Sequence, residues 1–342
     1  MKKKTAIITG ISGQDGAYLA EFLLKKNYRV IGTDRRSARS NFWRLRRLGI
    51  ENKIHYEEME LGENCEIDRL FKKYKKVDEV YNLAAQSFVA TSFNSPINTS
   101  NITALGTLRI LEAIRNYNKK IKFYQASSSE MYGEVLEKYQ NEKTPFNPKS
   151  PYAISKVFSH FMTKNYRESY NMFAVSGILF NHESPLRGEE FVTRKICLGL
   201  VKILNNDLGC LELGNINAKR DWGYAKEYVQ LMWKMLQNKK PQDFVIATGK
   251  HNSIKDFVDE TIKCLNIKAK WVGNGINKKL IRLKDKKVII KINKKFFRPA
   301  EVNLLHGDPS KARKVLKWKP KTDFKKLVRI MVEDEKKYYN KI

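Results

Sequence analysis

The stretch that decides the fold is Thr5-Ala6-Ile7-Ile8-Thr9-Gly10-Ile11-Ser12-Gly13-Gln14-Asp15-Gly16, near the start of the chain. Its first five residues form a short run of apolar and β-branched residues, which predicts a buried strand. The glycines that follow allow the backbone to approach a pyrophosphate at the N-terminus of the next helix. Their G-x-x-G-x-x-G spacing departs from the commoner G-x-G-x-x-G. Gly10–Gly16 is therefore predicted to bind a dinucleotide, with an ordinary tight turn as the alternative.

Short β-rich runs alternate with helical patterns through the first half of the chain. The predicted strands are Thr5–Thr9, Arg29–Thr33, Ile54–Glu58, Glu79–Asn82, Lys122–Ser127 and Phe173–Leu179, and the predicted helices are Tyr18–Lys26, Ile67–Tyr74, Thr103–Tyr117 and Tyr152–Tyr170. This alternation indicates βαβ units and a parallel sheet. The predicted fold class is α/β, a Rossmann-like doubly wound parallel sheet with a smaller interleaved C-terminal substrate domain.

The pattern becomes irregular after about Asn181, although Tyr224–Leu236 predicts a helix and Phe244–Ala247 one more strand of the sheet. We expect a dinucleotide-binding domain over residues 1–181 and a mainly substrate-binding domain over 182–342, with segments near 221–250 returning to the first domain. The lysine-rich stretch Lys278–Lys295 predicts an exposed excursion or hairpin.

Composition excludes several classes of protein. A chain of 342 residues with 42% hydrophobic content can bury a substantial core. Its four cysteines, at 65, 197, 210 and 264, include no Cys-x-x-Cys pair, so neither a disulfide framework nor a metal site is expected. No apolar run approaches the roughly 18 residues of a membrane span. We expect a soluble, cytoplasmic protein with no membrane partner.

The formal charge of +30, from 66 Lys+Arg against 36 Asp+Glu, raises the question of nucleic acid. The lysines are spread along the chain, without a basic tail or an RNA-binding signature. This distribution favours a solvated surface that also attracts a small anionic substrate, with a nucleic-acid or acidic partner as the alternative.

The end of the second predicted strand selects the cofactor. Asp34 could accept a hydrogen bond from a ribose 2′-hydroxyl, whereas Arg35 and Arg36 could neutralise a 2′-phosphate. The doubled arginine has bidentate donors suited to phosphate, so NADP is favoured and NAD is the alternative. The two arginines could instead begin a basic surface run that continues to Arg47.

Two further segments are predicted to contact the cofactor. Small residues leave the fourth strand at Leu83-Ala84-Ala85-Gln86-Ser87, where bulk would obstruct a bound dinucleotide; simple close packing is the alternative. Glu60 and Leu61 follow the third strand, where an adenine contact is expected.

Tyr152 and Lys156 fall four residues apart on one helical face, after Ser150 as N-cap and Pro151 at the first helical position. A nearby ammonium group and a cationic nicotinamide ring would both lower the pKa of the phenol towards use as a base. The alternative is an exposed pair without function; the upstream glycine turn favours catalysis.

Polar side chains in Gln125-Ala126-Ser127-Ser128-Ser129-Glu130 follow the fifth strand. They should lie at the carboxyl edge of the sheet, where open α/β sheets bind ligands. A serine-rich turn with a solvated glutamate is the alternative, and the position just before the Tyr/Lys helix favours a site.

At this point the chain resembles the extended short-chain dehydrogenase/reductase family and, within it, the GDP-mannose 4,6-dehydratases. The resemblance covers nearly the whole chain. Its most specific blocks are GILFNHESP at 177–185, FVTRKI at 191–196, AKRDWG at 218–223 and FRPAEV at 297–302.

The resemblance implies a lyase that ends with its NADP unchanged. Tyr152 would take the C4 hydroxyl proton as hydride leaves C4, with Lys156 holding the ribose. Glu130 would remove the C5 proton while the C6 hydroxyl departs as water, helped by Ser128. Return of the hydride to C6 gives a 4-keto-6-deoxy sugar for a deoxy-sugar pathway.

The resemblance also implies the binding residues. Near the cofactor it places His182 and Arg187 beside those already named. Around the GDP-sugar it places Ser87, Ser128, Glu130, Tyr152, Asn181, Val192, Lys195, Gly214, Arg220, Arg298 and Glu301. A homo-oligomer, a dimer or tetramer, is expected.

The sequence departs from the family pattern at three places: Ser128 stands where threonine is usual, Glu60 replaces an aspartate, and Arg35–Asn41 matches an oligomer-building loop only loosely. Ser128 leaves a GDP-manno-heptose open as substrate. An epimerase or decarboxylase of the same family is a further alternative. A non-catalytic binding protein is disfavoured by Tyr152, Lys156 and Glu130 together.

Overall fold

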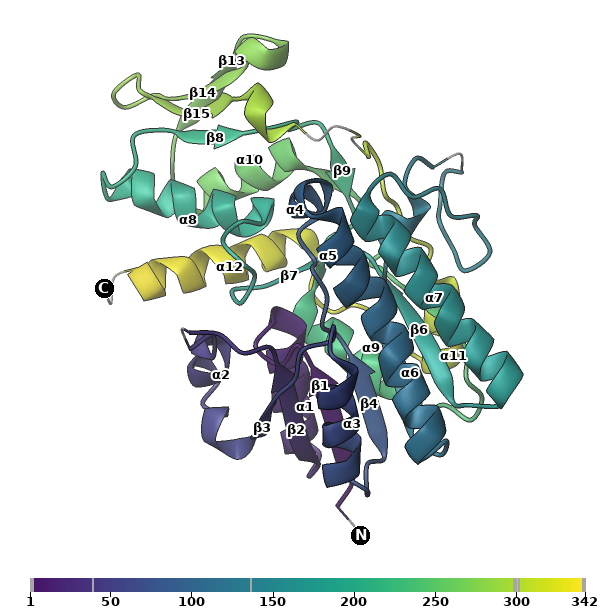
Figure 1. The fold of residues 1–342 in the computed structure, drawn as a ribbon. Helices are drawn as coiled ribbons and strands as arrows, with labels where there is room; N and C mark the ends of the chain where they lie inside the picture. The colour runs from purple at the N-terminus through teal and green to yellow at the C-terminus, as the bar shows by residue number, and fades with distance from the viewer. Residues whose placement is uncertain (1–2, 39, 136, 298–299, 301, 340–342) are drawn as a thin grey trace.

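The structure is a computed structural model that describes residues 3–38, 40–135, 137–297, 300 and 302–339. Its centre is a seven-stranded parallel sheet in the order β11-β6-β5-β4-β1-β2-β3 (Figure 1). The strands are β1 (Thr5–Thr9), β2 (Arg29–Asp34), β3 (His55–Glu58), β4 (Glu79–Asn82), β5 (Lys122–Ser128), β6 (Ala174–Leu179) and β11 (Phe244–Ile246). The chain runs outward in opposite directions from β1 and β4, which opens a crevice at their carboxyl ends.

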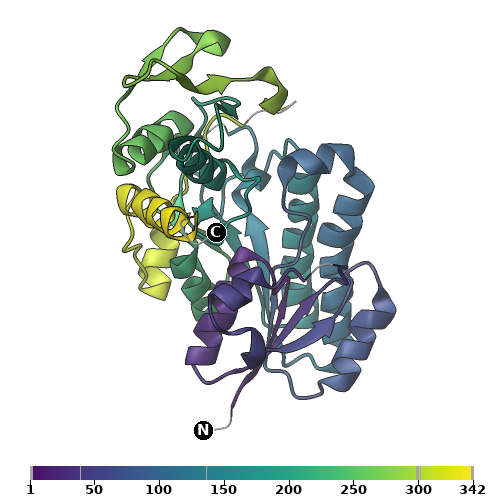
Figure 2. The ribbon, with the colours of Figure 1, turned by 90° about the vertical axis from the view of Figure 1, so that its left-hand side faces the viewer.

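Alternation along each strand divides the core between the two faces of the sheet. Ala6 and Ile8 of β1 pack beneath α1 (Gln14–Lys25) and α9 (Ala225–Gln237). Ile7, between them, packs on the other face, in a cluster with residues of three more helices. These are α3 (Asn64–Lys73), α6 (Gly106–Tyr117) and α7 (Pro151–Tyr170). Figure 2 shows the helices on both sides of the sheet, so the predicted doubly wound α/β class is confirmed.

A second lobe has its own core and its own sheet. Helices α8 (Val192–Leu204), α10 (Ile254–Cys264) and α12 (Phe324–Tyr339) pack together through Ile196, Phe257 and Val328. They lie against a four-stranded sheet in the order β13-β14-β15-β8. Its strands are β8 (Leu211–Leu213), β13 (Ala269–Val272), β14 (Lys279–Arg282) and β15 (Val288–Ile292). The lobe lies above the carboxyl end of the main sheet in Figure 1.

Short elements connect the two lobes and border the crevice. Two small ladders pair β7 (His182–Glu183) with β10 (Gly223–Tyr224) and β9 (Lys219–Arg220) with β12 (Asn252–Ser253). The remaining helices are α2 (Trp43–Arg47), α4 (Val89–Asn94), α5 (Pro96–Ser100) and α11 (Ser310–Leu316).

The expected elements agree with the structure except at the starts of three helices, of which the one expected from Ile67 begins at Asn64. The first helix begins at Gln14 rather than Tyr18, because the glycine turn opens directly into it. The helix expected from Thr103 begins at Gly106, after a π turn over Asn101–Leu105. Lys278–Lys295 forms a hairpin, so that alternative of the prediction is confirmed, although the stretch is not exposed throughout. Leu280 and Ile290 alternate with the lysines and are buried in the core of the second lobe.

Among the described residues, no helix combines the length and apolar character needed to span a bilayer. The same part of the chain contains no group of three or more His, Cys, Asp or Glu placed to hold a metal ion.

Candidate active site

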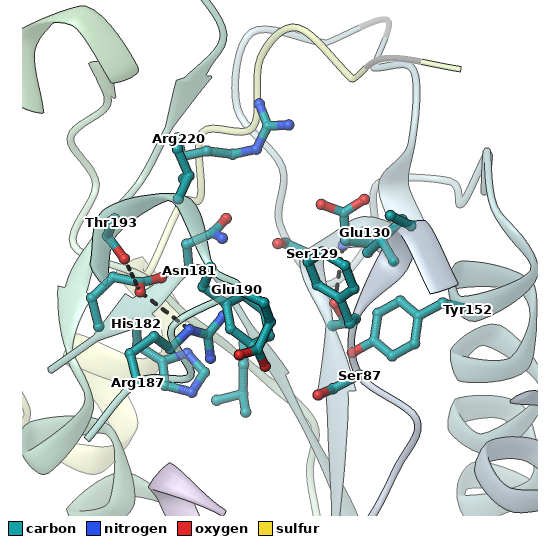
Figure 3. Close-up of a pocket in the computed structure, with 18 of the residues that line it drawn as sticks. Ser87, Ser129, Glu130, Tyr152, Asn181, His182, Arg187, Glu190, Thr193 and Arg220 are labelled. Atoms are coloured by element: carbon teal, nitrogen blue, oxygen red, sulfur yellow. Dashed lines mark hydrogen bonds and ion pairs between the residues drawn. The ribbon is translucent and has the colours of Figure 1, made fainter. Parts of the chain in front are cut away.

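A cavity of about 700 Å³ opens at the carboxyl end of the main sheet, between the two lobes (Figure 3). One wall carries the glycine turn, the ends of β4 and β5, and the start of α7. The other carries the segment from Asn181 to Lys195 and the ends of β8 and β9. It is the crevice expected from the strand order.

The glycine turn leaves no room for a side chain at Gly10 or Gly16. Gly10 has a φ of +70°, and a Cβ there would lie 3.0 Å from the backbone of Ala84. A Cβ on Gly16 would come within 2.3 Å of the Gly10 carbonyl oxygen. Gly13, the N-cap of α1, supplies no capping side chain. The first amides of the helix are therefore available to an anion, and the turn fits the pyrophosphate of a dinucleotide.

Two residues of this turn bind the opposite wall. The side-chain amide of Gln14 donates through Nε2 to the His182 carbonyl oxygen at 3.1 Å and accepts through Oε1 from the Ser184 hydroxyl at 2.7 Å. Asp15 Oδ2 lies 2.7 Å from His182 Nε2. Burial opposes both charges, but their mutual attraction outweighs it, so the pKa of His182 is raised and that of Asp15 is lowered. Gln14, Asp15 and His182 line the cavity and also fasten its two walls together.

The residues expected to select the cofactor lie at the end of β2, outside the cavity lining. The carboxylate of Asp34 accepts hydrogen bonds from the Ser12 hydroxyl and, at 2.9 Å, from the Arg35 amide. Arg35 and Arg36 are exposed. Asp34 is thus already engaged by two donors, while two guanidinium groups stand in solvent beside it.

The segment after β4 is fixed from beneath by Thr9. Its hydroxyl accepts from the amides of Leu83 and Ala84, both at 3.1 Å, and donates to Asn82 at 2.7 Å. Of this segment Leu83, Ala85 and Ser87 line the cavity. The others predicted to contact the cofactor here, Ala84, Gln86, Glu60 and Leu61, do not line it; neither do Ile11 and Ser12.

Tyr152 and Lys156 lie in the first turns of α7, as expected from the cap. The Ser150 hydroxyl accepts from the Ala153 amide at 3.1 Å, and Pro151 is the first helical residue. Lys156 Nζ donates to the Ala126 carbonyl oxygen at 2.7 Å. Burial lowers the pKa of Lys156 to about 8.

The pKa of Tyr152 moves the other way from the prediction. Burial raises it to about 12, only partly countered by hydrogen bonding with the Ser128 hydroxyl. The predicted lowering included the effect of a cationic nicotinamide ring. In the chain alone, desolvation penalises the phenolate more than nearby groups stabilise it.

Ser128 ends β5, Glu130 follows it, and both share the wall with Tyr152. The Ser128 hydroxyl accepts from the Glu130 amide at 3.2 Å, which begins a short 3₁₀ turn. Glu130 and Tyr152 both project into the cavity from the same side in Figure 3. A carboxylate and a phenol thus face one ligand volume.

The opposite wall carries five of the predicted substrate residues and two of the residues predicted near the cofactor. Arg187 Nε pairs with Glu183 at 3.2 Å, and Glu183 also accepts from the Thr193 hydroxyl. Lys195 Nζ donates to the Glu212 carbonyl oxygen at 2.7 Å. Asn181, His182, Arg187, Val192, Lys195, Gly214 and Arg220 all line the cavity. Arg298 and Glu301, also predicted, lie outside the described residues.

Several lining residues carried no prediction. Glu190 lies on the wall opposite Tyr152 in Figure 3, and Phe88, Phe191 and Phe296 also line the cavity. Phe191 and Thr193 belong to a block that indicated the family, which was the available signal. Phe88 and Glu190 gave none, since a loop residue reaches a cavity only through the path of the chain.

The fold and the paired Tyr152 and Lys156 beside a glycine turn are those of an extended short-chain dehydrogenase/reductase. Solved structures with the same fold include UDP-glucose 4-epimerase of Thermotoga maritima, at TM-score 0.81 and 20% identity, covering 98% of this chain and 99% of that one. A dTDP-glucose 4,6-dehydratase of Streptomyces venezuelae superimposes at TM-score 0.83 and 17% identity, covering 98% of each chain.

Sequence comparison narrows the class. A sequence model of the family described as GDP-mannose 4,6 dehydratase matches residues 7–331. GDP-mannose 4,6-dehydratase of Vibrio cholerae is 48% identical, covering 98% of this chain and 94% of that protein. The human GDP-mannose 4,6 dehydratase is 46% identical, covering 96% and 91%. The chain belongs to the GDP-mannose 4,6-dehydratase family, so the predicted family is confirmed.

Proposed function

We propose that this protein is a hydro-lyase that converts GDP-mannose to GDP-4-keto-6-deoxymannose with a bound nicotinamide dinucleotide. The observation that carries the proposal is the joint placement of Glu130, Ser128 and Tyr152 on one wall of the cavity. A carboxylate there serves proton removal at C5, a step that dehydration requires and C4 epimerisation does not. The relatives named for this reaction support the sugar and the nucleotide.

The cofactor would be held by the glycine turn, by the segment after β4 and by Lys156. A nicotinamide ring bound there supplies an acceptor for the C4 hydride and later a donor to C6. We favour NADP because the carboxylate of Asp34 is already engaged, whereas Arg35 and Arg36 are exposed and suited to a 2′-phosphate.

Tyr152 acts on the C4 hydroxyl in this proposal. With its pKa raised to about 12 by burial, the phenol is protonated in the chain alone. A positive charge brought against it favours the phenolate, and the Ser128 hydroxyl already works in that direction. The phenolate then takes the C4 hydroxyl proton as the ketone forms.

Glu130 and Ser128 act on the neighbouring carbons. The C4 ketone acidifies the C5 proton, and the Glu130 carboxylate removes it. The proton that Glu130 took from C5 passes to the C6 oxygen, which departs as water while hydrogen-bonded to the Ser128 hydroxyl. The proton that Tyr152 took from the C4 hydroxyl then goes to C5, so both side chains end in their starting state.

Replacing Glu130 by Gln tests the mechanism. The amide keeps the shape but cannot accept the C5 proton, so dehydration should fall by about 10²- to 10⁴-fold while dinucleotide binding is unchanged. Dehydration is measured by mass spectrometry of the GDP-sugar, which loses one water in the wild type. Dinucleotide binding is measured by isothermal titration with NADP. Dehydration at the wild-type rate would reject the assignment.

A GDP-manno-heptose is a second candidate substrate. Ser128 presents its hydroxyl to the cavity without the methyl group of a threonine, which leaves room beside the leaving group. The same mass-spectrometric assay on GDP-heptose and GDP-mannose decides between them by the ratio of kcat/KM. Equal turnover of UDP- or dTDP-sugars would contradict the GDP assignment.

Replacing Arg35 and Arg36 together by Ala tests the choice of cofactor. Loss of two charge-assisted contacts should weaken NADP binding by at least tenfold and leave NAD binding nearly unchanged. Titration of each dinucleotide measures this, with Arg46→Ala as an exposed-arginine control from the same segment. A variant that weakens both dinucleotides equally would remove the basis for NADP.

We also propose that the protein is a homo-oligomer and that residues 1–181, with α9 and β11, form its dinucleotide domain. An apolar stripe on α7 supports the first: Ile154, Phe158 and Phe161 are 57%, 36% and 51% exposed, at positions that share one helical face. Ile97 on the adjacent α5 is 86% exposed. The parallel pairing of β11 with β6 supports the inclusion of β11 in the dinucleotide domain.

A further inference from the structure

One lysine-rich stretch of the chain forms most of the sheet of the second lobe. From Lys268 to Lys295 the chain has ten lysines and one arginine, but a single acidic residue, Asp285. That aspartate is held by Arg282, at 2.9 and 2.5 Å. Among the described residues, Lys291 is the one lysine of this stretch with an acidic partner, Glu212 at 2.8 Å.

The strand register places the three lysines that lie in strands, Lys270, Lys279 and Lys291, on the outer side of the sheet. Leu280 is paired with Trp271 on one side and Ile290 on the other, and this row faces the core. The next row therefore faces outward. It contains Lys279 directly opposite Lys291, with the exposed Lys270 on the same face.

This arrangement weakens the sheet by itself. Two like charges directly opposite on neighbouring strands repel each other, and the ion pair of Lys291 offsets only part of that repulsion. A partner that neutralises the whole face would relieve it. Nothing in the proposed reaction uses Lys270, Lys279 or Lys291, none of which lines the cavity.

Exposed apolar side chains border this cationic face at both ends. Leu283, in the turn between β14 and β15, is 56% exposed and adjoins Lys284. Ile276, in the turn between β13 and β14, is 48% exposed. Figures 1 and 2 show these turns at the edge of the molecule, clear of the main sheet.

The chemistry of the face suits lipid better than nucleic acid. Its arginine is already bound to Asp285, and its one aromatic residue between 268 and 292, Trp271, faces inward. It therefore lacks the stacking platforms and bidentate donors that single strands and bases use. Lysines with apolar residues at the margins match an anionic bilayer surface.

We propose that the outer face of β13–β14–β15 is a peripheral docking surface for a membrane rich in anionic lipid. Ammonium groups of the lysines neutralise headgroup phosphates, and Leu283 and Ile276 enter the boundary with the acyl chains. The proposal departs from the expectation of no membrane partner, which rested on the absence of an apolar span and does not bear on surface binding.

Co-sedimentation of the full-length protein with vesicles tests the proposal. Vesicles of phosphatidylcholine with about 30% phosphatidylglycerol should bind the protein, whereas pure phosphatidylcholine should not. Binding should be lost at about 0.5 M salt, where screening is strong. The variant K270E/K279E/K284E should bind at least tenfold more weakly.

The matched control is K72E/K75E/K76E, which makes the same charge change on exposed lysines at the far end of the first lobe. It should bind as the wild type does. Equal weakening of both variants would show that net charge alone acts and would overturn the proposal, as would failure to bind anionic vesicles.

Two further measurements keep the outcome clear. Thermal melting should show that the variants are folded at the temperature of the assay, and K270Q/K279Q/K284Q replaces the charge-reversed protein if that one unfolds. A fluorescent single-stranded RNA bound at lower protein concentration than the vesicles, and released by the same substitutions, would assign the face to nucleic acid instead.

Discussion

Asp15 and His182 show how one residue pair can serve both binding and architecture. Asp15 was expected to contact the cofactor because it lies in the glycine turn. In the structure it also pairs with His182. The ring of Tyr228 stacks on that imidazole, with the two ring centroids 4.9 Å apart. The pair links the dinucleotide turn to the wall that carries Arg187.

Replacing Asp15 by Asn should destabilise the protein in a pH-dependent way. The pKa of His182 is raised, so the stabilisation is full below the ordinary imidazole pKa and is lost as pH rises through the raised value. Because the pKa of Asp15 is lowered, the stabilisation is also lost at acid pH, as the pH falls through that lowered value. The loss should be about 3 kcal/mol at pH 6 and smaller at pH 9.

Urea denaturation at the two pH values measures this loss. D285N, at an exposed residue that pairs with Arg282, is the control and should change stability little at either pH. A loss for D15N that is the same at pH 6 and pH 9 would contradict the raised pKa of His182.

At the scale of elements, local signals in the sequence predict where a helix begins, whereas packing decides which side chains are buried. The start of α7 was predictable because a serine cap and a proline act through the backbone next to them. The hairpin at Lys278–Lys295 was only half predictable, since lysines alternate with residues that find a core in the second lobe. The sequence showed the lysines but not the core.

Replacing Ser150 by Ala should weaken α7 at its first turn. The Ala153 amide loses its acceptor, at a cost of about 1 kcal/mol. Because that turn positions Tyr152, kcat should fall more than KM changes. Thermal unfolding and steady-state kinetics measure the two effects, and S150D, which restores a capping acceptor, should recover both; no recovery would argue against the cap.

At the scale of the molecule, the apolar stripe of α7 predicts the assembly. Lysine at both Ile154 and Phe161 should shift the protein to a monomer, because two charges cannot be buried in an apolar contact. Light scattering after size exclusion measures the mass. L204K, at a site on α8 that is 40% exposed, is the control and should leave the mass unchanged. A monomeric wild type would remove the proposal.

The sequence alone determined the alternation of strands and helices, the glycine turn, the Tyr152 and Lys156 spacing, and the family. These signals are local, because each depends on residues within a few positions of one another. Only the tertiary structure decided which of the predicted residues share one cavity. It brought Glu130 and Tyr152 to one wall and Arg187 and Arg220 to the other. It also raised the pKa of Tyr152 by burial, an effect that depends on every atom that excludes water from the phenol.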